Sequence, residues 1–332
     1  MNGLMAVDSV EVRVLVDNLT DNLSTVPSFV ETEVAAIERR RRGMWIMGGK
    51  CLCCAAHGLA CLVTIHQGGV TRTILFDTGP EDRVLEQNVA RLGVELGRVE
   101  AIVLSHGHWD HCGAMLCALQ LIRDRNGGNP VACYVHPDMF GKRALKRQDG
   151  SLRLMEDVAS LEELASFGAA TVNTREPQLL LEGSAYVSGE IQRVTTFERG
   201  FPGQYRQSTD GSGWVSDELM MDERFLAVNV TGKGLVIFSA CSHAGVINVL
   251  THAKSSLPGV PLHAVVGGLH LVGQNERIIP ETVKAMEAFD LDIIAAGHCT
   301  GWRAVTALAN AFGNGKLVPL SVGKRFLFSA GA

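Results

Sequence analysis

The sequence lacks any apolar run as long as the roughly 18–20 residues that a membrane-spanning helix needs. Its first twenty residues contain no basic stretch followed by an apolar one, so we expect no signal peptide. No short-period repeat or low-complexity tract is present, which excludes solenoid repeats and compositionally biased segments. These absences predict a cytoplasmic protein with no membrane partner.

The chain also lacks a strong excess of either charge. Its 35 acidic and 30 basic residues leave a net charge of −5, without a long basic block, so no nucleic-acid partner is expected. The one basic cluster is Arg39-Arg40-Arg41-Arg42. We interpret it as the solvated face of a helix or loop, with an anion or partner site as the alternative.

A disulfide framework is absent as well. The nine cysteines are odd in number and scattered, without the regular spacing of small secreted domains. Cys51, Cys53 and Cys54 lie close together and could hold a structural metal ion, but no second cysteine or histidine pair with zinc-finger spacing accompanies them. We therefore interpret most cysteines as small, partly buried residues.

The sequence does contain an alternation of apolar runs and amphipathic stretches. Apolar residues make up 46% of the chain, enough to bury a substantial core. Runs rich in β-branched residues predict strands at 12–16, 60–65, 73–76, 101–104, 132–135, 225–230, 235–238, 263–266 and 293–296. Helical patterns lie between them, at 80–96, 114–125, 246–255, 280–289 and 302–312. Both halves place strands first and then alternate strands with helices, which is typical of an α/β protein.

The segment around 142–216 departs from this alternation. It is rich in glycine, serine and charged residues, and we interpret it as an irregular insertion near the functional site. We expect one domain spanning 1–332 instead of two separable domains.

The positions of the histidines are the most informative pattern. Several follow a buried strand and precede a helix. Ligands collect at the carboxyl ends of strands in open α/β sheets, so polar side chains from several such turns can converge. The strand at 101–104 is followed by His106, His108, Asp110 and His111, the strand at 235–238 by Cys241 and His243, the strand at 263–266 by His270, and the strand at 293–296 by His298.

Imidazole and carboxylate groups together suit zinc, iron or manganese. In His106-x-His108, the alternation places both imidazoles on one side of an extended turn, while Asp110 and His111 point toward a neighbouring position. This arrangement favours two metal ions, expected to be Zn²⁺ with Mn²⁺ or Fe²⁺ as alternatives. Two ions about 3.5–4 Å apart can share a water molecule and lower its pKa, which produces hydroxide at neutral pH.

Further residues extend the predicted site. His243 and His298 are expected to be metal ligands, with a capping or hydrogen-bonding role as the alternative for His243. His270 is expected to be catalytic, as a ligand, as a substrate contact or beside a ligand. Asp77 ends a strand and is expected to accept an N–H from a ligating imidazole, with a turn or helix-cap role as the alternative.

Three residues stay open with respect to metal contact. Cys241 is expected beside the ligands, and its thiolate would suit zinc if it bound directly. His136 follows a strand but precedes Pro137, and His57 precedes a strand and could face the cleft.

The run His106-Gly107-His108-Trp109-Asp110-His111, preceded by Phe76-Asp77-Thr78-Gly79, resembles the metallo-β-lactamase superfamily, and the likeness covers nearly the whole chain. This resemblance implies an αββα sandwich with a dinuclear site at the sheet edge. One branch, the dihydropterin ribofuranosyl-aminobenzene 5′-phosphate synthase-like proteins, is similar in the motifs Cys241-Ser242-His243-Ala244-Gly245, Gly267-Gly268-Leu269-His270-Leu271, Gly297-His298-Cys299-Thr300-Gly301, Asp17-Asn18 and Asp222-Glu223.

The resemblance implies two ligand sets, namely His106 and His108 on one metal ion, and Asp110, His111 and His298 on the other. The chain departs from hydrolases such as glyoxalase II at two points. Cys241 stands where they have a bridging aspartate, and their separate third histidine has no match between His111 and Cys241 except His136. We expect His243 to take that third position.

The leading prediction is hydrolysis of an ester-type bond in a small-molecule substrate, either a phosphoester, lactone, thioester or lactam. A metal-bound hydroxide would attack, and Asp110 would position the nucleophile or relay its proton. Pterin or phosphoribosyl synthase chemistry of the same branch is the alternative. A di-iron redox protein is less favoured, because His108 stands where such proteins usually carry a carboxylate and no flavin domain is recognised. A homodimer is left open.

Overall fold

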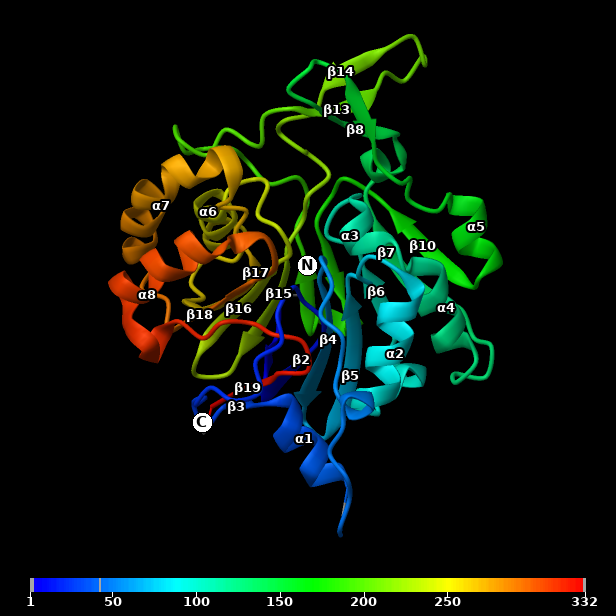
Figure 1. Ribbon diagram of the computed structural model, residues 1–332, viewed down its shortest axis with the longest axis vertical. Coiled ribbons are helices and arrows are strands. Elements are labelled where there is room, and N and C mark those ends of the chain that lie inside the picture. The colour runs from blue at the N-terminus through cyan, green and yellow to red at the C-terminus, as the bar shows by residue number, and fades with distance from the viewer. Residues whose placement is uncertain (1–2, 42, 331–332) are drawn as a thin grey trace.

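Two mixed β-sheets pack face to face and carry helices on their outer faces (Figure 1). The structure, a computed structural model, describes residues 3–41 and 43–330. Its layering confirms the expected αββα sandwich. Short 3-10 helices connect several elements, namely η1 (Gly49–Cys51), η2 (Leu96–Arg98), η3 (Pro137–Phe140), η4 (Leu181–Gly183), η5 (Gly273–Ile278), η6 (Glu287–Phe289) and η7 (His298–Thr300).

The first sheet belongs to the N-terminal half, with one strand from the C-terminus. Its strands are β2 (Ser9–Val16), β3 (Val30–Glu31), β4 (Ala60–Gln67), β5 (Val70–Phe76), β6 (Ala101–Val103), β7 (Val131–Val135), β10 (Ala169–Asn173) and β19 (Arg325–Ser329). They are ordered β10-β7-β6-β5-β4-β2-β19-β3, and β5, β6 and β7 run parallel. The helices of this half are α1 (Glu33–Arg40), α2 (Asp82–Leu92), α3 (Trp109–Cys112), α4 (Met115–Arg123) and α5 (Leu161–Ser166).

The second sheet belongs mostly to the C-terminal half. Its strands are β1 (Ala6–Val7), β11 (Gln178–Leu180), β12 (Ala185–Val187), β15 (Leu226–Val230), β16 (Gly234–Ser239), β17 (Leu262–Gly268) and β18 (Ile293–Gly297). β16, β17 and β18 are parallel neighbours, and β1 pairs with β15. Helices α6 (Val246–Ser256), α7 (Ile279–Met286) and α8 (Trp302–Lys316) cover its outer face, and α7 has the proline near its start that the sequence indicates.

Strand alternation explains how each sheet fills two apolar layers. On β5, Ile74 and Phe76 face the layer between the sheets, whereas Leu75 faces the helices. The ring centroids of Phe76 on β5 and Phe238 on β16 lie 6.0 Å apart in the central layer, and both side chains are fully buried. The central layer therefore fixes the position of one sheet on the other.

The segment 142–216 contains more regular structure than its composition indicates. β10 joins the first sheet, and β11 and β12 join the second. Four short strands form a separate antiparallel sheet, here named the roof sheet, that projects beyond the sandwich (Figure 1): β8 (Arg143–Lys146), β9 (Leu152–Leu154), β13 (Gln204–Gln207) and β14 (Trp214–Ser216). Its pairing of β8 with β13 joins residues about sixty positions apart, so local patterns do not reveal it.

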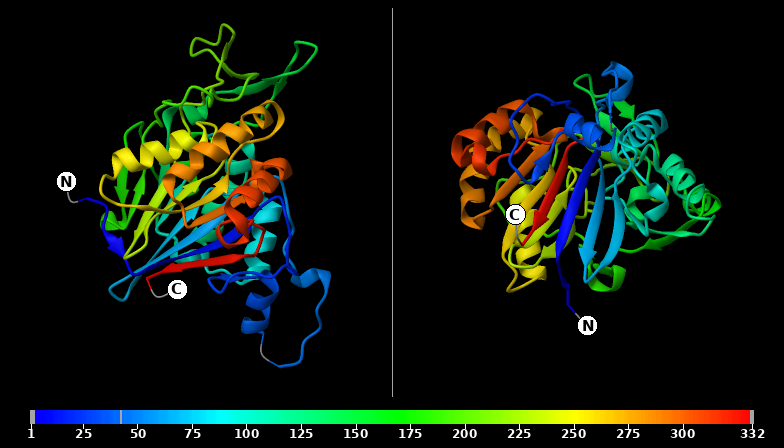
Figure 2. Two further views of the ribbon diagram at one scale, coloured as in Figure 1. Left: turned by 90° about the vertical axis from the view of Figure 1, so that its left-hand side faces the viewer. Right: turned by 90° about the horizontal axis from the view of Figure 1, so that it is seen from below.

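Arg39 and Arg40 of the basic cluster lie in the last turn of α1, a helix that projects from one end of the sandwich (Figure 2). The side chain of Arg39 is 60% exposed, and its Nε lies 2.8 Å from Glu31 Oε1. The guanidinium of Arg41 lies over the ring of Trp45, while Arg42 is outside the described residues. Across the part of the chain that the structure describes, no helix combines the length and apolar composition needed to cross a membrane.

Replacing Phe76 by alanine should lower the free energy of unfolding by about 3–5 kcal/mol, because it leaves a cavity between the two sheets. Urea denaturation followed by circular dichroism measures the loss. The control is Val70→Ala on the same strand, where the side chain is 52% exposed and the expected change is within about 0.5 kcal/mol. Equal losses in the two variants would contradict this account of the core.

Candidate metal centre

The histidine run occupies the turn between β6 and the short helix α3. His106 and His108 precede the helix, and Asp110 and His111 lie within it. Gly107 allows the close approach of η3 to this turn, since a Cβ there would lie 2.7 Å from the carbonyl oxygen of Met139. The turn thus directs its side chains to the edge where the strands of both sheets end.

The first donor group consists of His106, His108 and His243, whose candidate ligand atoms all lie within 4.8 Å of one another. His106 Nε2 is 3.1 Å from His108 Nδ1, and the ring of His243 lies 4.9 Å from each of the other two rings. Burial lowers the pKa of His106 and His243 far below the usual range and that of His108 to about 3. These imidazoles are therefore neutral, with lone pairs available.

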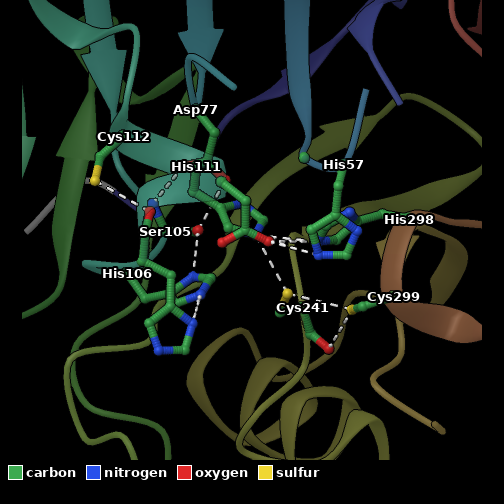
Figure 3. Close-up of polar contacts among 12 residues, drawn as sticks. His57, Asp77, Ser105, His106, His111, Cys112, Cys241, His298 and Cys299 are labelled. Atoms are coloured by element: carbon green, nitrogen blue, oxygen red, sulfur yellow. Dashed lines mark hydrogen bonds and ion pairs between the residues drawn. The ribbon is translucent and has the colours of Figure 1, made fainter. Parts of the chain in front are cut away.

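The second donor group consists of Asp110, His111, Cys241 and His298, again within 4.8 Å (Figure 3). His111 Nε2 lies 3.2 Å from both His298 Nε2 and Cys241 Sγ. Asp110 Oδ2 lies 3.4 Å from His298 Nε2 and 3.6 Å from His111 Nε2. Burial opposes ionisation of Asp110, but its imidazole neighbours outweigh it and hold the pKa of this carboxyl below its usual range.

Asp77 orients the second donor group through hydrogen bonds. Its Oδ1 accepts the Ser105 N–H at 2.7 Å, and its Oδ2 lies 2.8 Å from both Ser105 Oγ and His111 Nδ1. Ser105 Oγ is also 2.9 Å from His106 Nδ1, so one hydroxyl links the two groups (Figure 3). A carboxylate on Nδ1 orients the ring and leaves Nε2 of His111 free to act as a ligand.

Other buried acids fix the backbone of the turns that carry the donors. Asp17 Oδ1 accepts the His298 N–H at 2.9 Å, and Glu223 accepts the N–H of His243 at 2.8 Å. Asp222 Oδ2 accepts the Gly107 N–H at 2.8 Å and also lies 2.7 Å from Arg143 Nη2 on the roof strand β8. The motifs Asp17-Asn18 and Asp222-Glu223 thus act on the backbone of donor-bearing turns.

Four of these turns contain a residue with left-handed backbone geometry. Asp77 follows β5 with φ 57°, Ser242 follows β16 with φ 57°, His270 follows β17 with φ 44°, and His298 follows β18 with φ 48°. Such a conformation costs roughly 1–3 kcal/mol for a residue other than glycine and clusters at functional sites. Each of these turns changes the direction of the chain directly after a strand and brings polar side chains to the common edge.

A pocket of about 420 Å³ opens onto both donor groups. The sandwich contributes its floor, and the roof sheet with adjoining segments contributes side chains from the other side. The lining residues are Asn18, His57, His108, Trp109, Asp110, Leu145, Arg153, Met155, Phe201, Gln204, Cys241, His243, His270, Val272, His298, Cys299 and Gly301.

The residues left open at the sequence level take different positions. Cys241 lies among the donors of the second group. His57 lies at the pocket with its Nε2 3.4 Å from Asp110 Oδ2, whereas His136 lies outside both groups, 3.4 Å from Glu190. His270 lines the pocket, and its ring is tilted by 42° against that of His243 with the centroids 4.2 Å apart; with Cys241 and His243 it forms a further set of candidate ligand atoms.

Sequence reasoning assigned no role to Ser105 or Cys299. Ser105 stands directly before His106, and that position is the only signal it gives, because its bond to Asp77 joins two strands. Cys299 stands inside the motif Gly297-His298-Cys299-Thr300-Gly301, yet the motif does not show that its sulfur lies 3.2 Å from Cys241 Sγ.

Known proteins resemble this chain in sequence. The model of the metallo-beta-lactamase superfamily matches residues 58–182. The 7,8-dihydropterin-6-methyl-4-(beta-D-ribofuranosyl)-aminobenzene-5'-phosphate synthase of Methanocaldococcus jannaschii is 30% identical over 260 residues, which cover 77% of this chain and 85% of the relative. An uncharacterized protein of the same organism is 32% identical over 257 residues, which cover 77% of this chain and 88% of that protein.

Solved structures show the same fold. A metal-dependent hydrolase of the beta-lactamase superfamily has a TM-score of 0.70 and 21% identity, over 96% of this chain and 99% of that chain. The metallo-beta-lactamase fold protein YhfI from Bacillus subtilis has a TM-score of 0.50 and 12% identity, over 97% of this chain and 99% of its own. With the synthase similarity, these matches confirm the resemblance carried by the histidine run: the chain belongs to the metallo-β-lactamase superfamily.

Proposed function

We propose that this protein is a metal-dependent hydrolase that cleaves an ester-type bond in a small molecule, such as a phosphoester, lactone, thioester or lactam. The observation that carries the proposal is that both donor groups meet at one pocket. Concave pockets with a few convergent polar groups are the usual form of small-molecule sites. The superfamily supports metal-dependent chemistry on this scaffold.

The donor sets fit transition-metal ions. His108 Nε2 and both ring nitrogens of His243 are buried and have no hydrogen-bond partner. Leaving such atoms unpaired is costly, and a cation that accepts one lone pair from each ring would remove part of that cost. His106, His108 and His243 would hold one ion, and Asp110, His111, Cys241 and His298 the other, with Zn²⁺ preferred over Mn²⁺ or Fe²⁺. When bound, the ions supply Lewis acidity, which activates water and polarises the bond to be cleaved.

The chain's own residues would orient the reactants. Asp110 lies at the pocket with its Oδ2 3.4 Å from the imidazole nitrogens of both His57 and His298, so its carboxylate can accept a hydrogen bond from a nucleophile held there. His270 lines the same pocket beside His243 and would contact the substrate. The rings of Trp109 and Phe201 form part of the apolar wall of the pocket.

The pocket lining also favours a class of substrate. Arg153 on roof strand β9 is the only lysine or arginine among the described residues that line the pocket, and its side chain is exposed. Trp109, Met155 and Phe201 supply apolar surface around it. A guanidinium pairs well with carboxylate and phosphate groups, so we propose a substrate with an apolar body and a negatively charged group.

Synthase-type chemistry is the second candidate, favoured by the 30% identity to the Methanocaldococcus jannaschii synthase. A hydrolase transfers a group to water, whereas a synthase joins it to a second organic molecule. The two candidates are separated by product analysis. Product formed from one organic substrate in water supports hydrolysis, and product formed only when two organic substrates are present supports the synthase.

Chelation should abolish activity. Elemental analysis of the purified protein should find about two metal ions per chain, and a panel of phosphodiesters, lactones, thioesters and β-lactams should yield at least one substrate. Turnover should disappear with a chelator and return with Zn²⁺ or Mn²⁺. Full turnover by metal-free protein would refute the proposal.

Replacing Asp77 by asparagine should weaken metal binding at the second group by about 10–100-fold, because the amide cannot accept all the hydrogen bonds from Ser105 and His111. Chelator competition measures the affinity. Asp292→Asn is the matched control, since Asp292 also pairs with a histidine (His263, 2.7 Å) but is 62% exposed and does not line the pocket. Equal affinities in the two variants would show that Asp77 does not orient a ligand.

Replacing Arg153 by alanine should raise KM roughly tenfold for a negatively charged substrate, the equivalent of about 1.4 kcal/mol. KM for a neutral analogue should stay unchanged, as should kcat for both. The control is Arg147→Ala, an exposed arginine on the β8–β9 connection that does not line the pocket. The same KM change for charged and neutral substrates would argue against charge recognition by Arg153.

A further inference from the structure

The roof sheet presents a row of three side chains to the pocket, here named the pocket row. Gln204 on β13 pairs with Leu145 on β8, and Leu145 pairs with Arg153 on β9. Paired residues on neighbouring strands project from the same face of a sheet, and all three residues line the pocket. The row therefore places an amide, an apolar side chain and a guanidinium one after another across the roof.

Arg143 shows which way this face of the roof is turned. It lies two residues before Leu145 on β8, so the two side chains share a face of the sheet. Its Nη2 lies 2.7 Å from Asp222 Oδ2, the oxygen that also accepts the Gly107 N–H of the histidine turn. The face that carries the pocket row is therefore turned toward the sandwich and the first donor group.

Gln204 is the member of the pocket row whose polar atoms the fold does not use. The residue is only 5% exposed, and its side-chain amide has no hydrogen-bond partner within the part of the chain that the structure describes. Asn18, the other amide side chain at the pocket, differs. Its Nδ2 donates to the carbonyl oxygen of His298 at 3.2 Å, and its Oδ1 accepts the Gly58 N–H at 3.1 Å. A buried amide without a partner is unfavourable, so a molecule in the pocket that pairs with Gln204 gains affinity.

We propose that Gln204 is a specificity-determining residue, and that the pocket row selects a substrate with an amide-type group at one end and an anionic group at the other. The inference rests on the proposed small-molecule site and narrows its substrate class. A carboxamide offers a donor beside an acceptor, so it pairs with another carboxamide, a lactam or a similar edge with adjacent N–H and C=O groups. Arg153 pairs with carboxylate or phosphate, and Leu145 packs against the apolar part between them.

The spacing of the strands indicates the shape of such a substrate. β13 and β9 flank β8, and neighbouring strands lie about 4.8 Å apart, so the two polar members of the row project from strands roughly 10 Å apart. A molecule that contacts both without drawing their side chains together is elongated. Phe201 and Met155 supply further apolar surface at the pocket.

Monoamides of α,ω-dicarboxylic acids test the pocket row directly, because each molecule carries a carboxamide and a carboxylate joined by an alkyl chain. Titration calorimetry of the unmodified, metal-loaded protein should give an affinity that peaks at one intermediate chain length. At that length the diamide, which lacks the charge, and the monocarboxylic acid, which lacks the amide, should each bind roughly tenfold more weakly, as expected for the loss of one polar contact.

Gln204→Met removes the hydrogen-bonding atoms and keeps the length of the side chain. It should weaken binding of the monoamide roughly tenfold and leave that of the monocarboxylic acid unchanged. Gln207→Met is the matched control, because Gln207 lies on the opposite face of the same strand and does not line the pocket. Its affinities should equal those of the unmodified protein. Circular dichroism shows whether each variant folds, and Gln204→Leu replaces Gln204→Met if the latter does not.

Arg153→Ala should show the converse pattern, with weaker binding of the monoamide and the acid and unchanged binding of the diamide. Equal losses for the monoamide and the acid in Gln204→Met would overturn amide recognition by Gln204. An affinity that does not depend on chain length would overturn the pocket row as a unit. Acid binding that survives in Arg153→Ala and disappears with a chelator would place the carboxylate at the metal ions and overturn its assignment to Arg153.

The binding assay needs no turnover, so it separates this inference from the proposed hydrolysis. The expected binding pattern in a metal-loaded protein that hydrolyses no compound of the panel counts against the hydrolase alone. Turnover of an amide-bearing substrate with a KM that is unchanged in Gln204→Met refutes this inference alone.

Discussion

Several buried imidazole rings face one another at the candidate metal centre, and they can bind a metal ion only if they stay neutral and hold their positions. Much of the surrounding structure fixes these positions. His106, His108 and His243 present lone pairs to the same small volume, where burial keeps their pKa low. Asp77 binds the far nitrogen of His111. His111 is thereby fixed through Asp77, and His106 through the Ser105 hydroxyl that Asp77 also binds.

The same requirement explains the buried acids. Asp17, Asp222 and Glu223 carry charge into the interior, which is unfavourable unless hydrogen bonds satisfy their oxygens. In each case the partner is the backbone N–H of a donor residue or of its neighbour. Asp17 and Glu223 thereby support turns that contain a left-handed residue, His298 and Ser242 respectively.

The sequence predicts some levels of this structure better than others. The strands that carry the donors are found within about two residues of their expected bounds, because apolar β-branched runs followed by glycine and histidine are local signals. The convergence of His106, His243 and His298 follows from one rule about strand ends. The resemblance then supplies the pairing of donors into two groups.

Features that depend on long-range contacts escape this reasoning. His136 also follows a strand, yet its turn leads into η3, and it lies with Asp138 and Glu190 in a separate group away from the two donor groups, so position after a strand alone does not place a histidine at the common edge. The roof strand β13 is a short polar segment whose partner, β8, lies far away in the sequence. Cys299 reaches Cys241 only because Gly268 on a third strand lacks a side chain.

Asp222 connects the roof sheet to the turn that carries His106 and His108. One oxygen atom, Oδ2, serves both Arg143 in the roof sheet and the backbone of Gly107, which stands between His106 and His108. A molecule that displaces the roof therefore also strains the turn that carries these two histidines. Arg143 of the roof and the turn between His106 and His108 thus share one carboxylate oxygen. β8 is thus the roof strand that contacts, through Asp222, the turn carrying the two histidines.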